Sequence, residues 1–395
     1  MEGSLSNLLP SLVKEGVFGD VELVDIKYTK DETMGAQFGS GLNFVTLNVK
    51  GTTEESLDIV VKSAVSFRPD SLGLFQVELL MYKEVLPALG FKTEWYPKFY
   101  YGFVDHENPE NSVLIFDNLK SRNYSNSPSK IFLDYGHISV AMKKLAKFHS
   151  LSFILKHEHA QKFEELKNKI KGCSIELPES MKSEANVDAQ IAVRAFQEEH
   201  GKEELLEQFL NVLGNMGQIM ELFDEPKEPF AVICHGDFCN NNVIYKYDKN
   251  GSPIDCAFLD FQMSRYSTIV SDLSFFLYLN TDSELREKYW DEFLKIYWET
   301  LRENVPEHIS VPSFENFLEH FSQFAIHGLN ISTFFLPVMM DPFPADTIFS
   351  LTEEDHDERR RSPKGQEISR KVIDLVSHFY HKEYLHALLD YMNKS

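Results

Sequence analysis

Three polar residues in the middle of the chain stand where short β-rich runs end. Asp237 and Asn242 lie five positions apart just after one such run, and Asp260 follows the hairpin that comes next. Phosphoryl transfer needs a carboxylate that faces an acceptor hydroxyl, and an amide and a second carboxylate that hold magnesium on nucleotide phosphates. The H-x-D-x-x-x-x-N spacing from His235, with a downstream D-F pair, is typical of this chemistry. The pattern predicts Asp237 as the catalytic residue and Asn242 and Asp260 as the Mg2+ ligands.

The same chemistry requires a strand lysine for the α- and β-phosphates and a glutamate on the following helix to hold it. Lys62 ends an apolar run, and Glu78 follows on a predicted helix between Phe75 and Tyr82. This spacing places Glu78 on the core-facing side of the helix. An acid on an apolar face is costly unless it is paired. We therefore expect Glu78 to pair with Lys62.

Two further segments could contact a nucleotide. Gly39 and Gly41 precede a predicted strand at 44–49, where a flexible turn could cover the phosphates. Asp117 and Leu119 follow a predicted strand at 113–116, and their backbone groups could pair with adenine at a hinge.

The periodicity of the chain predicts the elements that must position these residues. A helix is predicted over 74–86, and strands are predicted over 21–29, 44–49, 57–61, 100–104 and 113–116. Residues 1–119 are therefore expected to form a small, β-rich α+β lobe that binds the nucleotide. Residues 120–395 read as mainly helical, with a β patch at 231–259 that holds the catalytic loop and the metal site. Helices after 138, including a predicted helical acceptor-binding insert, complete this larger lobe.

The composition is that of an ordinary globular protein. The 395 residues hold 39 Lys and Arg against 61 Asp and Glu, a formal net charge of −22, which argues against a nucleic-acid partner. Four cysteines are too few for a disulfide scaffold, and no apolar run is long enough to span a bilayer. We expect a cytoplasmic protein with no membrane association and no obligate protein partner.

The chain resembles the insect ecdysteroid kinase-like family, within the choline and aminoglycoside kinase clan of protein-kinase-like folds, over about residues 20–390. The residues that carry the resemblance are Gly41, Asn43, Phe44, Lys62, Phe75, Glu78, the segments 145–150, 235–242 and 259–262, Arg265, Tyr266, Asp272 and Leu273. The resemblance implies a two-lobed fold, ATP and Mg2+ as cofactors, Asn43 in the nucleotide loop, and a small-molecule alcohol as acceptor, with ecdysteroids or foreign compounds as its class.

Two positions depart from the family pattern, because Cys239 stands where tryptophan is usual and Asn240 where a small apolar residue is usual. Both could reshape the acceptor pocket. A choline- or aminoglycoside-type kinase and a non-catalytic nucleotide-binding scaffold are the alternatives to an ecdysteroid kinase. His235 is expected to be structural. The spacing of Cys234, His235 and Cys239 fits no usual zinc pattern.

Overall fold

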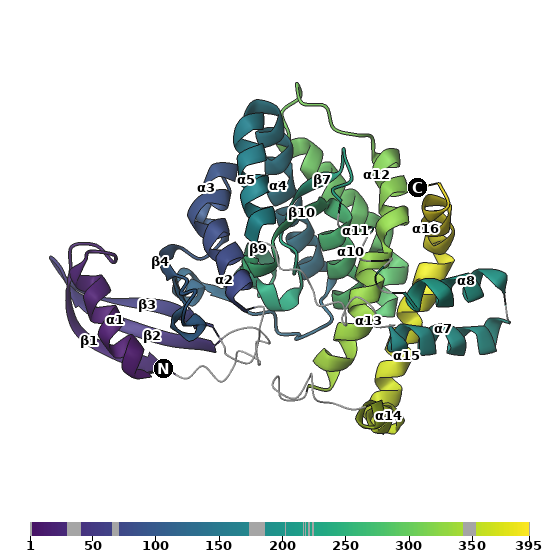
Figure 1. Ribbon diagram of the computed structural model, residues 1–395, viewed down its shortest axis with the longest axis horizontal. Helices are drawn as coiled ribbons and strands as arrows, with labels where there is room; N and C mark the ends of the chain where they lie inside the picture. The colour runs from purple at the N-terminus through teal and green to yellow at the C-terminus, as the bar shows by residue number, and fades with distance from the viewer. Residues whose placement is uncertain are drawn as a thin grey trace.

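The computed structural model describes most of the chain in two successive parts, a β-rich N-terminal lobe and a mainly helical C-terminal lobe (Figure 1). The described residues are 2–29, 41–64, 71–173, 186–201, 203–215, 217, 219, 222, 225–342 and 353–394. The predicted site residue Gly39 lies outside them.

The N-terminal lobe is built on an antiparallel sheet that contains all five predicted strands. In space the strands run in the order β1-β2-β3-β5-β4. Their bounds are β1 Glu22–Thr29, β2 Gly41–Lys50, β3 Glu54–Ser63, β4 Phe99–Phe103 and β5 Val113–Asp117. Along β5, alternate side chains enter two different hydrophobic cores, Val113 and Ile115 on one face and Leu114 and Phe116 on the other. Successive side chains of a strand point to opposite faces of the sheet. The two cores therefore cover both faces of the sheet at β5.

Different helices cover the two faces. Helix α1 (Glu2–Lys14) packs Leu9, Leu12 and Val13 against one face, and α2 (Ser71–Leu80) covers the other with Phe75 and Val77. The sequence analysis did not predict α1. Figure 1 shows it lying across the sheet at the N-terminal end of the molecule.

The predicted helix over 74–86 is longer than expected and is not uniformly α-helical. It starts with α2, passes through a π-helical turn at Met81–Val85, and ends with α3 (Leu86–Leu89). In the wide turn the Leu86 N–H donates to the Met81 carbonyl, five residues back. Pro87 comes next, and its ring would clash with a carbonyl four residues earlier in a regular α-helix, which the wider turn relieves.

The C-terminal lobe is mainly helical, with two small sheets on the side that faces the N-terminal lobe. One sheet pairs β7 (Ala231–Cys234) with β10 (Arg265–Thr268), and the other has the order β6-β8-β9, from β6 (Tyr124–Ser125), β8 (Val243–Tyr247) and β9 (Pro253–Phe258). Strands β6 and β10 were not predicted. The helices are α4 Tyr135–Glu158, α5 Ala160–Cys173, α7 Val187–His200, α8 Glu204–Leu213, α10 Ile269–Asn280, α11 Ser283–Asn304, α12 Phe314–Phe324, α13 Ile326–Met340, α14 Glu353–Arg361, α15 Pro363–His381 and α16 Tyr384–Met392.

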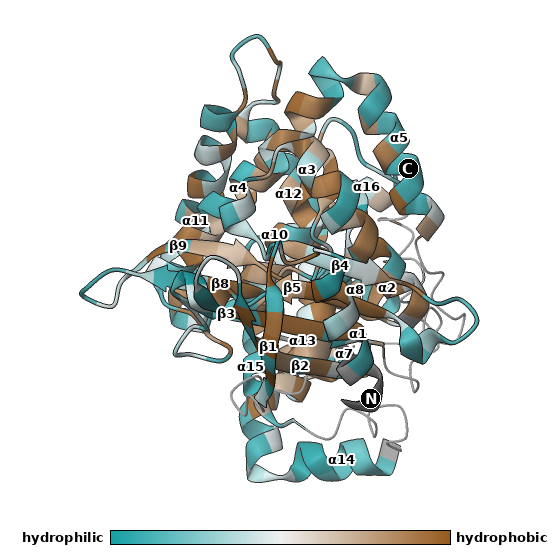
Figure 2. Ribbon diagram, turned by 90° about the vertical axis from the view of Figure 1, so that its left-hand side faces the viewer, coloured by the Kyte–Doolittle hydropathy of each residue, from teal (hydrophilic) through white to brown (hydrophobic). Residues whose placement is uncertain are grey.

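Hydropathy follows this architecture. Apolar residues concentrate on the inner strands and on α13, whereas α14 is hydrophilic along its length and projects at one end of the molecule (Figure 2). Helix α14 and the start of α15 carry a dense run of charged residues, from Glu353 to Glu367. Among the described helices, none has the length and apolar character needed to cross a membrane. All four cysteines are free thiols.

Candidate active site

Lys62 lies near the end of β3 at the centre of a buried polar cluster. It stands opposite Leu114 of β5, whose side chain enters the core beneath α2, so Lys62 points to the same face of the sheet. Its Nζ lies 2.6 Å from Oε2 of Glu78 on α2 and 2.7 Å from Oδ1 of Asp260. It also donates to Oε1 of Gln262 at 3.2 Å. These acceptors account for all the N–H donors that an ammonium group has.

The charges of this cluster determine its protonation. Burial alone would lower the pKa of Lys62, but the negative charges of Asp260 and Glu78 outweigh it and raise that pKa above its ordinary value. Burial raises the pKa of Glu78 to about 7, a shift that Lys62 opposes and Asp260 reinforces. A charged lysine thus lies between two carboxylates, one from each lobe of the protein.

Asp260 reaches Lys62 from the loop that follows β9. Its backbone is left-handed, with φ of 61°, and it immediately precedes a short 3-10 turn at Phe261–Met263. A non-glycine residue in this conformation is strained, and such strain gathers at functional sites. The Leu259 N–H donates to the Asn242 carbonyl at 2.9 Å, so the loop that carries Asp260 is joined to the loop that carries Asn242.

Asp237 and Asn242 contact each other directly. The Nδ2 group of Asn242 donates to the Asp237 carboxylate and to the Asp237 carbonyl, each at 2.8 Å. Desolvation and the negative charge of Asp260 raise the pKa of Asp237, although the Asn242 hydrogen bond and His235 oppose the shift. Because Nδ2 of Asn242 is used in this way, its Oδ1 is the atom that a cation would take.

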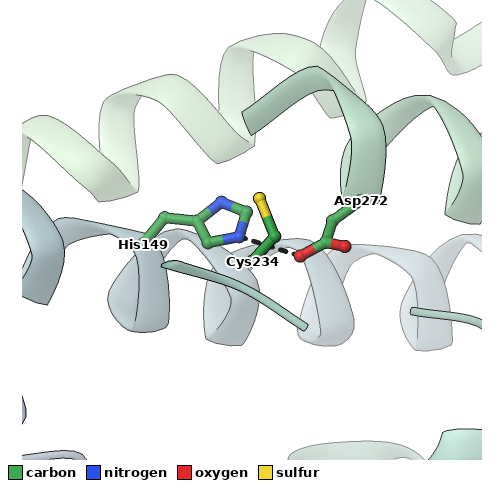
Figure 3. Close-up of side chains that lie close together, drawn as sticks. All are labelled: His149, Cys234 and Asp272. Carbon is green, nitrogen blue, oxygen red and sulfur yellow. Dashed lines mark hydrogen bonds and ion pairs between the residues drawn. The ribbon is translucent and has the colours of Figure 1, made fainter. Parts of the chain in front are cut away.

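The loop that carries Asp237 is held from behind by a buried carboxylate. Asp272 on α10 accepts the His235 N–H at 2.7 Å and the Gly236 N–H at 2.8 Å. It also accepts from Nε2 of His149 at 3.1 Å (Figure 3). The Nδ1 of His149 lies 2.7 Å from the Tyr297 hydroxyl. Burial would raise the pKa of Asp272, but these hydrogen bonds and the nearby histidines hold it below its ordinary value. The loop conformation therefore depends on a charged, fully hydrogen-bonded Asp272.

His149, Cys234 and Asp272 lie close enough together to be considered as a metal site (Figure 3). All three are buried, and the imidazole and carboxylate are already engaged in the hydrogen bonds above. Burial also raises the pKa of the Cys234 thiol, which disfavours the thiolate that a metal would bind. We interpret this cluster as structural support for the loop.

Gly236, directly before Asp237, occupies a position that no other residue can take. Its φ is +86°, and an added Cβ would lie 1.8 Å from the Met263 carbonyl oxygen. The loops that carry Asp237 and Asp260 therefore approach each other at backbone distance, which only glycine permits.

His235 donates from Nε2 to the Leu259 carbonyl at 2.8 Å and is fully buried. This contact ties the two loops together from a position behind Asp237, as a structural histidine would.

The described residues of the predicted nucleotide loop lie beside Lys62. Gly41 opens β2 and pairs with Ser63, whose hydroxyl donates to the Gly41 carbonyl at 3.3 Å. Asn43 pairs with Val61 on the same strand as Lys62. Both residues therefore lie at the same end of the paired strands β2 and β3 as the lysine.

Backbone hydrogen bonds within the predicted hinge reduce the number of groups that could pair with adenine. The Asp117 N–H donates to the Lys98 carbonyl at 2.9 Å, and the Leu119 carbonyl accepts from Asn123. The Asp117 carboxylate forms an ion pair with Arg122 at 2.9 Å. The expected contact with adenine is thus restricted to the Asp117 carbonyl and the Leu119 N–H.

Gln262 is a site contact that the sequence prediction lacks. It is buried and accepts a hydrogen bond from Lys62. Its position two residues after Asp260 was the available signal, because the same turn presents both side chains to the lysine.

A strand lysine held by a helix glutamate, facing two loops that carry Asp237, Asn242 and Asp260, is the arrangement of kinase-like phosphotransferases. The sequence pattern of the ecdysteroid kinase-like family matches residues 34–308. The chain belongs to this family, and it is therefore a member of a family of small-molecule kinase-like phosphotransferases. The match begins after α1 and β1 and ends before α12.

Solved structures with a similar overall architecture include three phosphotransferases. A putative aminoglycoside phosphotransferase from Ralstonia eutropha is 10% identical, with a TM-score of 0.46, and 96% of this chain and 98% of that one are covered. A choline kinase from Streptococcus pneumoniae is 16% identical, with a TM-score of 0.40 and coverage of 93% and 99%. A microcompartment-associated aminopropanol kinase is 9% identical, with a TM-score of 0.46 and coverage of 96% and 98%. No curated protein sequence matches the chain.

Proposed function

We propose that this protein is an ATP- and Mg2+-dependent phosphotransferase that transfers the γ-phosphate to a hydroxyl group of a small molecule. The acceptor that we propose is an ecdysteroid or a related steroid or xenobiotic alcohol. The observation that carries the proposal is the meeting of Lys62, which is held by Glu78, with Asp260 of the other lobe at 2.7 Å. No residue of the set that phosphoryl transfer needs is missing from the chain.

The donor set supports magnesium at the proposed metal position. Asn242 and Asp260 offer an amide oxygen and carboxylate oxygens, the hard ligands that Mg2+ prefers, and the Leu259–Asn242 backbone hydrogen bond joins their loops. When bound there, Mg2+ would neutralise charge on the β- and γ-phosphates.

The protein's own residues would carry the remaining steps. The Lys62 ammonium would contact the α- and β-phosphates, with Glu78 keeping it in place. Asp237 would accept the hydrogen bond of the acceptor hydroxyl and take its proton as the oxygen bonds to the γ-phosphorus and the bond to the ADP oxygen breaks. The raised pKa of Asp237 suits this role, because a more basic carboxylate accepts a proton more readily. Most of the rate would come from positioning.

Arg265 adds a positive charge beside the loop that carries Asp237. Arg265 lies directly beside the loop, with Nη1 3.4 Å from the Gly236 carbonyl and Nη2 3.3 Å from Nε2 of His327. Burial and the Arg265 charge lower the pKa of His327 to about 3, so the imidazole is uncharged and adds no second positive charge beside Arg265. Arg265 thus opposes a cationic acceptor such as choline or an aminoglycoside, whereas the carboxylates of Asp237 and Asp260 attract one, and the acceptor assay decides between the two classes.

Two further features belong to this proposal. We place the boundary between the nucleotide-binding and catalytic lobes at residues 119 and 120, where β5 has ended and the chain enters the C-terminal lobe. We also propose a cytoplasmic location, which the four free thiols support.

The test uses the purified full-length chain with ATP and MgCl2, incubated with ecdysteroids, plant sterol glycosides, simple alcohols, choline and aminoglycosides. Mass spectrometry would detect a gain of one phosphate, with Asp237→Asn measured alongside. A phosphorylated ecdysteroid that disappears in the variant is the expected result. A phosphorylated choline or aminoglycoside would overturn the acceptor class, and ATP binding without any product would favour a non-catalytic scaffold.

A further inference from the structure

The segment that joins the first strand of the C-terminal lobe to its first long helix has no regular secondary structure of its own. Residues 126–134 join β6 to α4, and no helix or strand falls within them. Upstream of this connecting segment, β6 pairs with β8, and a 3-10 turn at Leu119–Arg122 separates β6 from β5. The connecting segment is therefore held by hydrogen bonds from neighbouring parts of the C-terminal lobe and not by strand pairing.

Asn240, in the loop between Asp237 and Asn242, supplies one of these contacts. Its Nδ2 donates to the carbonyl of Ser129 at 3.0 Å and to the carbonyl of Lys130 at 3.1 Å. One amide group thus bridges two successive peptides of the connecting segment. Asn240 is only 8% exposed, so these hydrogen bonds are shielded from water.

Asn280, the last residue of α10, supplies the next contacts. Its Nδ2 donates to the Ile131 carbonyl at 3.0 Å, and its own carbonyl accepts the Leu133 N–H at 2.8 Å. Its Oδ1 accepts the backbone N–H of Asn240 at 3.1 Å. The connecting segment, the catalytic loop and the end of α10 are therefore joined by one buried hydrogen-bond network.

This arrangement is not what packing alone would select. The small apolar residue usual in the family could make none of the side-chain contacts of Asn240. Within the described residues, Oδ1 of Asn240 is buried without a hydrogen-bond partner, which costs stability. A polar group that is kept at such a cost calls for an explanation beyond stability.

We propose that Asn240 is a positioning residue, which fixes the connecting segment to the catalytic loop so that the Asp237–Asn242 pair keeps its placement against that segment. The catalytic part of this inference rests on the proposed phosphotransferase activity. Asn240 touches neither Asp237 nor a phosphate in this scheme. It acts by holding the loop two residues before Asn242 and three residues after Asp237.

The test compares Asn240→Ala and Asn240→Asp with a matched control, Asn241→Ala. Asn241 is the next residue of the same loop, and its side chain is exposed. Alanine removes both donated hydrogen bonds, and aspartate keeps the shape of the side chain but faces the two carbonyls with a group that cannot donate. Hydrogen–deuterium exchange of the full-length chain would report on peptides that cover 126–134, and steady-state kinetics would separate kcat from the KM for ATP.

The expected result is faster exchange in 126–134 for both Asn240 variants, with exchange of β1–β3 unchanged and Asn241→Ala like the wild type. The kcat should fall about ten-fold while the KM for ATP changes less, because the reacting groups are displaced rather than removed. Unchanged exchange in 126–134 would show that Asn240 does not fix the connecting segment, whatever the activity of the enzyme proves to be. Faster exchange with unchanged kcat per folded molecule would overturn the positioning role and leave Asn240 purely structural.

Discussion

The two halves of the candidate site are held by different kinds of interaction. Lys62 and Glu78 sit on a strand and a helix, and both side chains enter one packed core beneath α2. Asp237 and Asp260 sit on loops, and Asn242 ends a short 3-10 turn at Asn240–Asn242. Those loops are held by side chains that accept or donate backbone hydrogen bonds, above all Asp272.

The difference shows what positions each half. Packing of apolar side chains fixes the lysine half, since strand register and helix periodicity decide which way each side chain points. Polar residues far away in the sequence fix the loop half, because a loop has no ladder of its own. Loss of a polar contact should therefore displace the backbone of the loop half, whereas in the lysine half it should leave the backbone in place. Substitutions in each half test this contrast.

The largest effect on catalysis is expected from the loop half. Asp237→Asn should lower kcat about 10²- to 10⁴-fold, because it removes the carboxylate that accepts the hydroxyl proton. Phosphate transfer to an identified acceptor would be measured, with ATP binding by calorimetry as the control. Turnover at the wild-type rate would show that another group accepts the proton.

In the lysine half, Lys62→Met should lower kcat on the order of 10²-fold, because a charge that faces the phosphates is lost. It should also destabilise the fold by about 3–5 kcal/mol, because Glu78 would remain buried without its cation. Urea unfolding and the transfer assay measure the two effects separately.

The double variant Lys62→Met/Glu78→Gln is the control for this prediction. It removes both charges, so stability should return toward the wild-type value while activity stays low. If the double variant were as unstable as Lys62→Met alone, the loss would come from packing rather than from an unpaired acid.

A smaller effect on catalysis is expected behind the loop. Asp272→Asn should cost about 2 kcal/mol of stability, because the buried N–H groups of His235 and Gly236 lose a charged acceptor. It should lower kcat about ten-fold through a displaced Asp237. A variant with wild-type kcat and reduced stability would show that Asp272 stabilises the fold without contributing to catalysis.

The same substitution has a pH signature. The pKa of Asp272 is below its ordinary value of 3.8 in the folded protein, so its contribution is fully present above about pH 4. That contribution is lost as the pH falls through the lower, folded-state pKa. The stability difference between wild type and Asp272→Asn, measured by urea unfolding, should therefore shrink on acidification below pH 4. A difference that grows there would contradict the assigned protonation.

The smallest effect on catalysis is expected on the face of the sheet that is turned away from Lys62. Leu9→Ala in α1 removes a fully buried side chain and should cost about 2–5 kcal/mol. Below the melting temperature, kcat and the KM for ATP should remain unchanged. A large change in either value would mean that α1 contributes to the site as well as to the core.

The sequence predicts the lysine half of the site better than its surroundings. The apolar run at 57–61 and the spacing of Phe75, Glu78 and Tyr82 are local signals, and the structure shows the resulting Lys62–Glu78 pair. Helix α1 also had a local signal, Leu8, Leu9 and Leu12 at helical spacing, but Pro10 within it argued against a helix.

The loop half of the site could be predicted from the sequence only in part. Spacing alone indicated Asp237, Asn242 and Asp260, whereas the bridge from Asn240 to Ser129 and Lys130 joins positions more than one hundred residues apart. No periodicity encodes such a contact, because it depends on how two irregular segments meet. Strand β10 was missed for a similar reason, since four residues give too short a pattern.

Lys62 has one more consequence for a nucleotide that enters the site. Its ammonium group already has as many acceptors as it has hydrogen atoms, in Glu78, Asp260 and Gln262. A phosphate oxygen can bind it only by taking the place of one of these partners. When the nucleotide binds, Lys62 therefore exchanges one hydrogen bond for another and the number of its hydrogen bonds stays the same. The carboxylate or amide that Lys62 releases can then bind a new ligand.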